Sequence, residues 1–127
     1  DVVAATDIRL MKGDALDLLP DVLTGLPARV CVFHSTCLMY WSPDAKAALD
    51  NLLKDASRTR DIWRIGIEPS ANFDSWYAGR SATPQGAKRL EQASWGEVII
   101  SRYHAGNVES RIAAGTAWDG GVVAWIP

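Results

Sequence analysis

The chain has few of the residues that build disulfide-rich, metal-rich or membrane-bound proteins. It contains two cysteines and two histidines in 127 residues, too few for the disulfide framework of a secreted domain and a poor basis for a metal centre. It has no apolar run of membrane-spanning length and no charged-then-apolar leader. It also lacks a basic block, and its net charge is −2, which disfavours nucleic acid as a partner. These absences favour a reduced, cytoplasmic setting, with no metal, membrane or nucleic acid bound.

The remaining composition is that of an ordinary globular protein. Hydrophobic residues make up 48% of the chain and charged residues 22%, and the length fits one domain. We therefore expect residues 1–127 to form a single domain. No Gly-rich phosphate or dinucleotide loop is present, and the first residue is Asp1 rather than Met. From this we expect the domain to be the carboxy-terminal half of a larger protein.

The first part of the chain alternates predicted strands and helices. Ile8–Lys12 alternates apolar and charged residues, which is typical of a short strand near a sheet edge. Asp17 fits a helix N-cap, because Pro20 then falls in the first turn, where its missing N–H does no harm. Arg29–Ser35 shows almost no alternation, so we expect a central parallel strand covered on both faces, with Cys31 as a small core residue.

The clearest helix signal follows this strand. Ser42-Pro43-Asp44 supplies a hydroxyl cap, a proline at the first helical position and an acid at the positive end of the helix dipole. Apolar residues then recur at helical spacing as far as Ala56. Asp61–Glu68 is predicted to be the next strand. A strand, a helix and a second strand in this order favour a parallel pair.

The second part of the chain changes to a period of two. Between Pro69 and Ser94 the pattern is lost, and we expect a long connection with a short helix around Gly86–Gln92. Further on, the pattern predicts an antiparallel hairpin and one more strand after a Gly-rich turn: Val98–His104, Val108–Ala114 and Val122–Ile126. The predicted fold class is therefore α/β, a partial Rossmann-like sheet with parallel strands flanked by helices and an antiparallel carboxy-terminal hairpin.

This order of elements resembles the second half of a class I, S-adenosylmethionine-dependent methyltransferase. The chain is more closely similar to the bacterial family called domain of unknown function 2332. The similarity covers nearly the whole chain but only the carboxy-terminal part of that family's proteins. It rests on these segments: Gly13-Asp14-Ala15 with Leu19-Pro20, Val32-Phe33-His34-Ser35, Leu38-Met39-Tyr40 with Ser42-Pro43, Ile67-Glu68-Pro69, and Gly120-Gly121 with Trp125.

The resemblance implies a methyltransferase-like fold and S-adenosylmethionine as the cofactor of the intact protein. Gly13-Asp14-Ala15 looks like the adenine-contacting turn of that superfamily. There the acid accepts a hydrogen bond from the adenine amino group and the next backbone N–H donates to the ring, which gives these roles to Asp14 and Ala15. Read without the resemblance, Asp14 is a turn or helix-capping residue. The groups that hold the methionine and ribose parts are expected before Asp1, so we expect no cofactor on residues 1–127 alone.

Polar residues at the carboxyl ends of the two predicted parallel strands are the other candidates, because α/β sheets bind ligands there. His34 is a candidate catalytic base that would deprotonate an acceptor hydroxyl, thiol or ammonium; the alternative is a structural imidazole bonded to a loop. Ser35 would orient a substrate or cofactor carboxylate, or simply end the strand. Tyr40 and Glu68 would line the acceptor pocket. Alternatively, Tyr40 and Trp41 seat the following helix, and Glu68 bonds loop N–H groups.

Three functional hypotheses follow, and they leave open whether the protein is an enzyme. The leading hypothesis is methyl transfer from S-adenosylmethionine to an unknown small acceptor by the intact protein, with residues 1–127 alone inactive. The second is a non-catalytic Rossmann-like binding or interaction module. The third is a hydrolase in which His34 activates the Cys37 thiol. An exposed edge of the sheet also predicts self-association as a homodimer.

Overall fold

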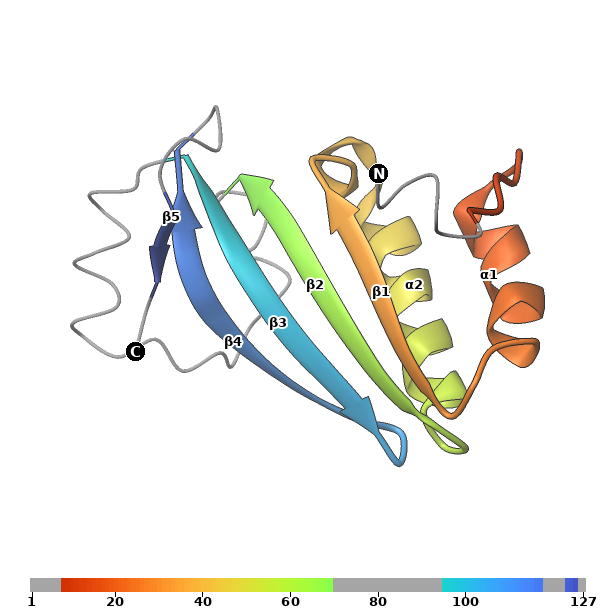
Figure 1. Cartoon of the computed structure of the whole chain (residues 1–127). Helices are drawn as coiled ribbons and strands as arrows, with labels where there is room; N and C mark the ends of the chain where they lie inside the picture. The colour runs from red at the N-terminus through yellow and green to blue at the C-terminus, as the bar shows by residue number, and fades with distance from the viewer. Residues whose placement is uncertain (1–7, 70–94, 118–122, 126–127) are drawn as a thin grey trace.

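The computed structural model describes residues 8–69, 95–117 and 123–125, which form a mixed five-stranded sheet with two α-helices (Figure 1). The predicted α/β class is confirmed at this level. Along the chain the elements are α1 (Ala15–Thr24), β1 (Arg29–Ser35), the 3-10 turn η1 (Leu38–Tyr40), α2 (Pro43–Ala56), β2 (Asp61–Pro69), β3 (Gly96–His104), β4 (Asn107–Thr116) and β5 (Val123–Trp125).

The strands of the sheet lie in chain order, from β1 to β5. β1 and β2 are parallel and are connected through α2, whereas β2, β3, β4 and β5 pair antiparallel. The register sets His34 opposite Gly66 and Ser35 opposite Ile67. The carboxyl ends of the two parallel strands therefore lie side by side, at the end of the sheet where both helices begin (Figure 1).

The helix predicted from Ser42-Pro43-Asp44 is confirmed as α2. Its N-cap is Ser42, whose Oγ accepts from the backbone N–H of Ala45 at 3.2 Å, and Pro43 is the first helical residue. Leu49 and Leu53 are the fully buried residues of the helix. The cap and the apolar stripe thus act together, because one fixes where the helix begins and the other fixes which side faces the sheet.

The predicted hairpin is confirmed as β3 and β4. Its loop consists of Ala105 and Gly106, which have φ angles of 49° and 79°. Positive φ at both central residues is the geometry of a tight hairpin turn whose twist matches that of the strands. Residues 70–94, with the predicted helix at Gly86–Gln92, and the Asp119-Gly120-Gly121 turn lie outside the described residues.

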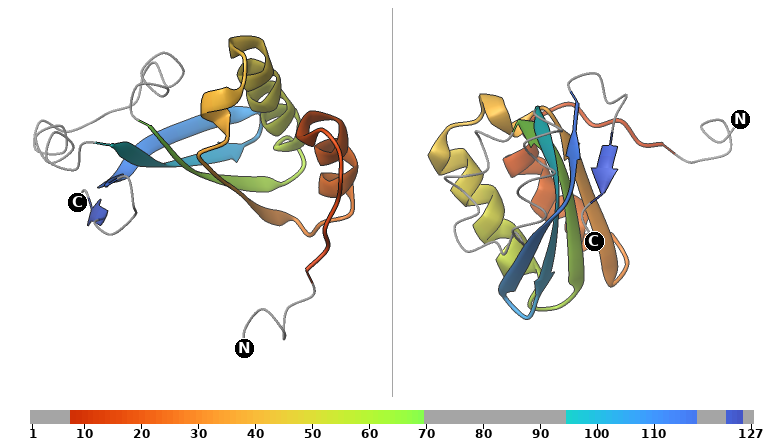
Figure 2. Two further views of the ribbon diagram at one scale, coloured as in Figure 1. Left: turned by 90° about the horizontal axis from the view of Figure 1, so that it is seen from above. Right: turned by 90° about the vertical axis from the view of Figure 1, so that its left-hand side faces the viewer.

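Both helices pack on the same face of the sheet, and the core lies between them and the strands (Figure 2). The Tyr103 hydroxyl, which reaches α2 from β3, donates to Asp50 at 2.7 Å. Neither described helix has the length and apolar character that crossing a membrane requires. One buried cluster of the core consists of Leu23, Leu38, Leu49, Leu53, Ile62 and Tyr103.

Ser57 ties the end of α2 to the β3–β4 hairpin. Its carbonyl oxygen accepts from the N–H of Ala105 at 3.0 Å, and its Oγ accepts from the N–H of Gly106, also at 3.0 Å. The side chain is 2% exposed. The register of Ile62 with Tyr103 places this tie at the amino ends of β1 and β2. It is therefore at the opposite end of the sheet from His34.

Two predictions at the start of the chain are wrong. Ile8–Lys12 is not a strand: no described strand lies beside it to complete a ladder, and Leu10 is 91% exposed. The helix N-cap is Asp14 rather than Asp17, because Asp14 Oδ1 already accepts from the N–H of Leu16 at 2.8 Å. Pro20 consequently lies inside α1, where it leaves one helical carbonyl without its usual donor.

The prediction of a central β1, covered on both faces, is also wrong for the described residues. Exposure alternates along the strand, and Phe33 is 62% exposed. Cys31, expected in the core, is exposed as well. The reason is that both described helices cover one face, while β1 has only β2 as a neighbour in the described sheet. An apolar strand sequence does not specify how many of its faces are covered.

Candidate functional site

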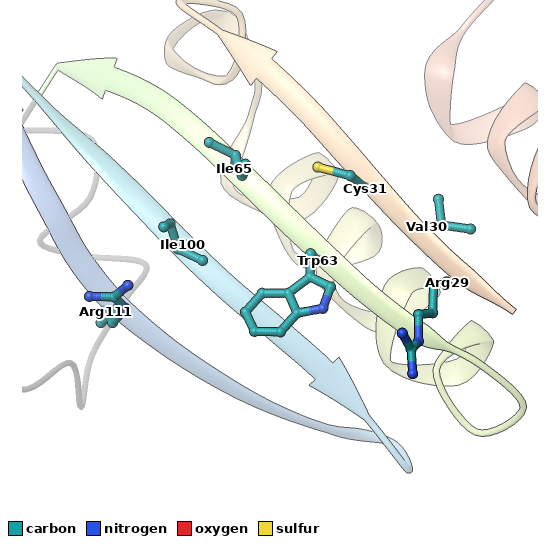
Figure 3. Close-up of a pocket in the computed structure, with 7 residues that line it drawn as sticks. All are labelled: Arg29, Val30, Cys31, Trp63, Ile65, Ile100 and Arg111. Atoms are coloured by element: carbon teal, nitrogen blue, oxygen red, sulfur yellow. The ribbon is translucent and has the colours of Figure 1, made fainter.

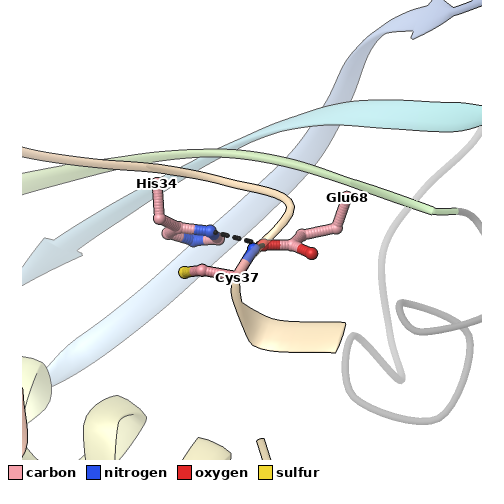
Figure 4. A group of neighbouring side chains, drawn as sticks. All are labelled: His34, Cys37 and Glu68. Atoms are coloured by element: carbon pink, nitrogen blue, oxygen red, sulfur yellow. Dashed lines mark hydrogen bonds and ion pairs between the residues drawn. The ribbon is translucent and has the colours of Figure 1, made fainter. Parts of the chain in front are cut away.

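A buried histidine–glutamate pair lies at the carboxyl ends of β1 and β2 (Figure 4). His34 Nδ1 is 3.1 Å from Glu68 Oε1, and the side chains are 8% and 1% exposed. Side chains two residues apart share a face of a strand, so Gly66 and Glu68 both point to the helix-covered side. His34 lies on the same side, and the parallel register brings it beside them.

Glu68 also holds the start of η1. Its Oε1 accepts from the backbone N–H groups of Cys37 at 3.0 Å and Leu38 at 2.9 Å, and its Oε2 accepts from Met39 at 3.3 Å. The first N–H groups of a helical turn have no partner within the turn itself. One carboxylate therefore satisfies these donors and orients the imidazole at the same time. The alternative in which Glu68 bonds loop N–H groups agrees with this geometry.

Thr36 forms the turn that brings the backbone N–H groups of η1 next to the Glu68 carboxylate. Its φ angle is 56°, a left-handed conformation that is unusual for a β-branched residue. Its N–H donates to the carbonyl of Ile67 at 2.8 Å, which continues the pairing of β1 with β2 by one residue. Backbone strain of this kind is concentrated at functional and switch regions. The sequence carries no signal for it.

Gly66 provides the space that the imidazole occupies. A Cβ atom at this position would lie 2.6 Å from His34 Cε1 and 2.8 Å from Nε2. No side chain other than hydrogen fits there while His34 stays in place. The sequence analysis missed Gly66, although a glycine between Ile65 and Ile67 inside a strand is a sign of close approach by another group.

The environment of the pair fixes the position of one proton. Burial raises the pKa of the Glu68 carboxyl, but the hydrogen bonds from His34 and from the N–H groups of Leu38 and Cys37 outweigh it, so the pKa lies below its ordinary value. An ionised carboxylate only accepts, so His34 Nδ1 carries the proton. Nε2 is then the basic nitrogen, and among the described residues it has no hydrogen-bond partner.

The lowered pKa of Glu68 predicts a specific loss of stability in acid. Its stabilising contribution is complete above its ordinary pKa near 4.5 and is lost as the pH falls through the lower pKa of the folded state. We expect the unfolding free energy of the wild type to fall below about pH 4.5 more steeply than that of Glu68→Gln. Urea titrations from pH 6 to pH 3 test this, and parallel profiles would contradict it. Asp61, whose pKa is also lowered, is present in both proteins.

Cys37 lies beside the pair, but its surroundings favour the thiol. Burial and the charge of Glu68 raise the pKa of Cys37, and a hydrogen bond from its own backbone N–H offsets this only in part. The ligand atoms of His34, Cys37 and Glu68 lie within 4.8 Å of one another, and N, S and O donors of this kind can bind zinc. However, Glu68 Oε1 already accepts three hydrogen bonds. The geometry therefore describes a hydrogen-bonded assembly better than a metal centre.

The two cysteines should consequently differ in reactivity. Cys31 is exposed on β1, whereas Cys37 is partly buried and has a raised pKa. We expect iodoacetamide at pH 8 to modify Cys31 about ten times faster, because the thiolate is the reactive form. Fragmentation mass spectrometry separates the two sites within one peptide. Faster labelling of Cys37 would favour the hydrolase hypothesis.

The other candidate residues are not gathered around His34. Asp14 is the exposed N-cap of α1, and Ala15 is its first helical residue. Ser35 is exposed, on the opposite side of β1 from His34, and its Oγ lies 3.1 Å from Thr36 Oγ1. Tyr40 is 79% exposed. Trp41 packs against the core beside α2, which favours the interpretation that it seats the helix.

The comparisons with known proteins place the chain in one family. No curated protein and no solved structure matches it. A family model described as an uncharacterised protein conserved in bacteria matches residues 1–125. That match spans nearly the whole chain and agrees with the resemblance found in the sequence. The chain therefore belongs to the family of domain of unknown function 2332.

Proposed function

We propose that the intact protein is a methyltransferase that uses S-adenosylmethionine and a small acceptor, with His34 as the base. The observation that carries this proposal is the arrangement of His34 itself. Its Nδ1 is held by a buried carboxylate and its Nε2 has no partner among the described residues. His34 and Glu68 both lie at the carboxyl ends of parallel strands, where α/β folds bind ligands. A Rossmann-like architecture is part of this proposal.

The residues at the start of α1 fit the adenine end of the cofactor. One oxygen of the Asp14 carboxylate accepts from Leu16, which leaves the exposed second oxygen for an amino group. The Ala15 N–H belongs to the first helical turn, whose donors have no acceptor within the helix. The helix α1, which follows Asp14, begins at the end of the sheet where β1 and β2 end (Figure 1). S-adenosylmethionine, when bound, would supply an electrophilic methyl carbon.

His34 and Glu68 would then manage the proton of the acceptor. An acceptor O–H, S–H or N–H group must lose its proton when its lone pair forms the new bond to carbon. His34 Nε2 would receive that proton, and the resulting imidazolium would be stabilised by the Glu68 carboxylate at Nδ1. Glu68 is thus a positioning residue in this proposal, rather than a residue of the acceptor pocket.

Calorimetric titration of S-adenosylmethionine and S-adenosylhomocysteine into the full-length gene product tests the proposal. Saturable binding is expected, and failure to bind either ligand would overturn it. His34→Asn is the informative second variant, because its amide nitrogen can still donate to Glu68 while the basic Nε2 is gone. It should keep cofactor binding and thermal stability but release no S-adenosylhomocysteine with a candidate acceptor. Unchanged turnover would remove His34 from the reaction.

Asp14 can be tested for its two roles separately. Asp14→Ala should lower the unfolding free energy by about 1 kcal/mol, since it removes a helix cap. Asp14→Ser restores a capping oxygen but shortens the side chain that would reach adenine. We therefore expect normal stability but at least about tenfold weaker S-adenosylmethionine binding for the serine variant, in line with one lost hydrogen bond to a charged group. Wild-type affinity in Asp14→Ser would show that the residue is only a cap.

A further inference from the structure

The basic nitrogen of His34 is closed off from an acceptor in this structure. Nε2 is buried and has no hydrogen-bond partner among the described residues, and the side chain as a whole is 8% exposed. A base must come within roughly 2.6–3.2 Å of the group whose proton it removes. Reaction at His34 therefore requires a movement that opens a path to Nε2.

The groups around the imidazole show which side is able to move. Gly66 of β2 lies on one side, where a Cβ atom would be 2.8 Å from Nε2. That side is fixed, because β2 is paired with β1 and with β3. The Cys37 side chain lies on the other side of the ring (Figure 4), and the ligand atoms of His34, Cys37 and Glu68 are within 4.8 Å of one another. Since Cys37 is the N-cap of η1, this short turn is the movable cover among the described neighbours.

The contacts of η1 divide into those that hold it closed and one that favours opening. The Glu68 carboxylate accepts from the first N–H groups of the turn, and the Leu38 side chain is 2% exposed in the core. Both of these hold the turn against the sheet. Thr36, directly before the turn, has a φ angle of 56°, a conformation that costs energy for a β-branched residue. A movement that lets Thr36 leave the left-handed region would release that energy.

We propose that η1, together with its N-cap Cys37, is a gate that swings about Thr36 and controls access to His34 Nε2. In the open state an acceptor reaches the base, and in the closed state water is kept away from the reacting groups. This inference rests on the proposed role of His34. It concerns access to the nitrogen, however, so it can be tested without cofactor or acceptor.

Diethyl pyrocarbonate measures this access, because it acylates a neutral imidazole nitrogen that it can reach. The chain contains two histidines, and His104 is a matched internal control. Its Nδ1 also faces a carboxylate, that of Asp61, but its side chain is 63% exposed. At pH 7 we expect His34 to be modified about 100 times more slowly than His104, since it reacts only while the gate is open. Equal rates for the two histidines would overturn the proposal.

Two leucines of one core cluster distinguish opening of η1 from unfolding of the whole fold. Leu38→Ala removes the anchor of the gate, whereas Leu23→Ala shortens a leucine on α1 that is buried to the same degree. We expect Leu38→Ala to speed modification of His34 about tenfold or more, and Leu23→Ala to change it by less than about twofold. Equal acceleration by the two variants would overturn the gate. A wild-type rate that rises with urea as steeply as global unfolding would do the same.

Two substitutions at Thr36 test the hinge without disturbing the core. Thr36→Asn adopts the left-handed conformation at lower cost, whereas Thr36→Val keeps the branched side chain and its strain, and both remove the hydroxyl. Thr36→Asn should hold the gate closed, so that His34 is modified about five times more slowly than in Thr36→Val, with His104 unchanged. The same rate in both variants would contradict a hinge at Thr36 and overturn the proposal. Calorimetric binding of S-adenosylmethionine does not depend on this result, so the gate and methyl transfer can fail separately.

Discussion

Replacing Gly66 with alanine is expected to lower the free energy of unfolding by about 2–3 kcal/mol, as overpacking of a well-filled site does. The new Cβ would lie 2.6 Å from His34 Cε1. A flexible surface side chain would move away at little cost, but the imidazole is buried and its Nδ1 is bonded to Glu68. Either the ring leaves that hydrogen bond or the two strands separate. Urea denaturation of the two proteins measures the difference.

Gly25→Ala is the matched control for this substitution. Within the described residues, the only atom found near a Cβ at Gly25 is the carbonyl oxygen of Val22, at 3.8 Å, and the residue has a right-handed φ of −83°. The control should change stability by less than about 0.5 kcal/mol. The double variant His34→Ala/Gly66→Ala should lose less than the sum of the single variants, because the clash no longer exists. Additive losses would show that Gly66 does not act through His34.

Replacing Glu68 with alanine should have the largest effect of any single substitution in the site, about 3–5 kcal/mol. Glu68 is fully buried, and its carboxylate accepts four hydrogen bonds, three of them from backbone N–H groups. Alanine leaves these donors buried without a partner, and each unsatisfied group carries its own desolvation cost. We expect the η1 turn and the start of α2 to become disordered, which hydrogen exchange at Leu38 and Met39 would report.

Two comparison variants separate the charge of Glu68 from its shape. Glu68→Gln keeps one accepting oxygen but presents an NH₂ group to backbone donors, so we expect an intermediate loss of about 2 kcal/mol. Glu109→Ala removes an exposed acid from β4 and should cost no more than about 0.5 kcal/mol. If Glu68→Ala destabilised the protein as little as Glu109→Ala, the carboxylate would not be the anchor of the turn.

Local signals in the sequence predicted the elements whose formation depends on neighbouring residues. Ser42 and Pro43 specify the start of α2 by capping chemistry, and residues 105–107 specify the hairpin because its flanking strands alternate. The start of α1 was misplaced because two aspartates three residues apart, Asp14 and Asp17, can both serve as caps. Sequence alone does not show which one meets a free N–H group.

The geometry of the site depends on contacts between distant parts of the chain. The sequence could predict which residues lie near one another there, but not the hydrogen bonds between them. The predicted strand ends correctly placed His34 and Glu68 at the same end of the sheet. The bonds from Glu68 to Cys37 and Leu38 join residues about 30 positions apart, and they depend on the left-handed Thr36, which no local pattern marks. Likewise, the pocket that Arg29 and Arg111 line on the face of the sheet opposite the helices (Figure 3) arises from the register of four strands, which only the assembled sheet fixes.

The hydrogen bonds of Ser57 restrain α2 relative to the sheet. Because this serine joins the last turn of α2 to the β3–β4 hairpin, the helix is clamped to the sheet at one end. Because Tyr103 also bonds Asp50 in the middle of the helix, we expect any opening between α2 and the strands to be largest at the start of the helix. That end is where Glu68 holds the turn leading into α2. The hydrogen bonds of Ser57 thus hold the last turn of α2 on the sheet, and those of Glu68 hold the turn that leads into its first residue.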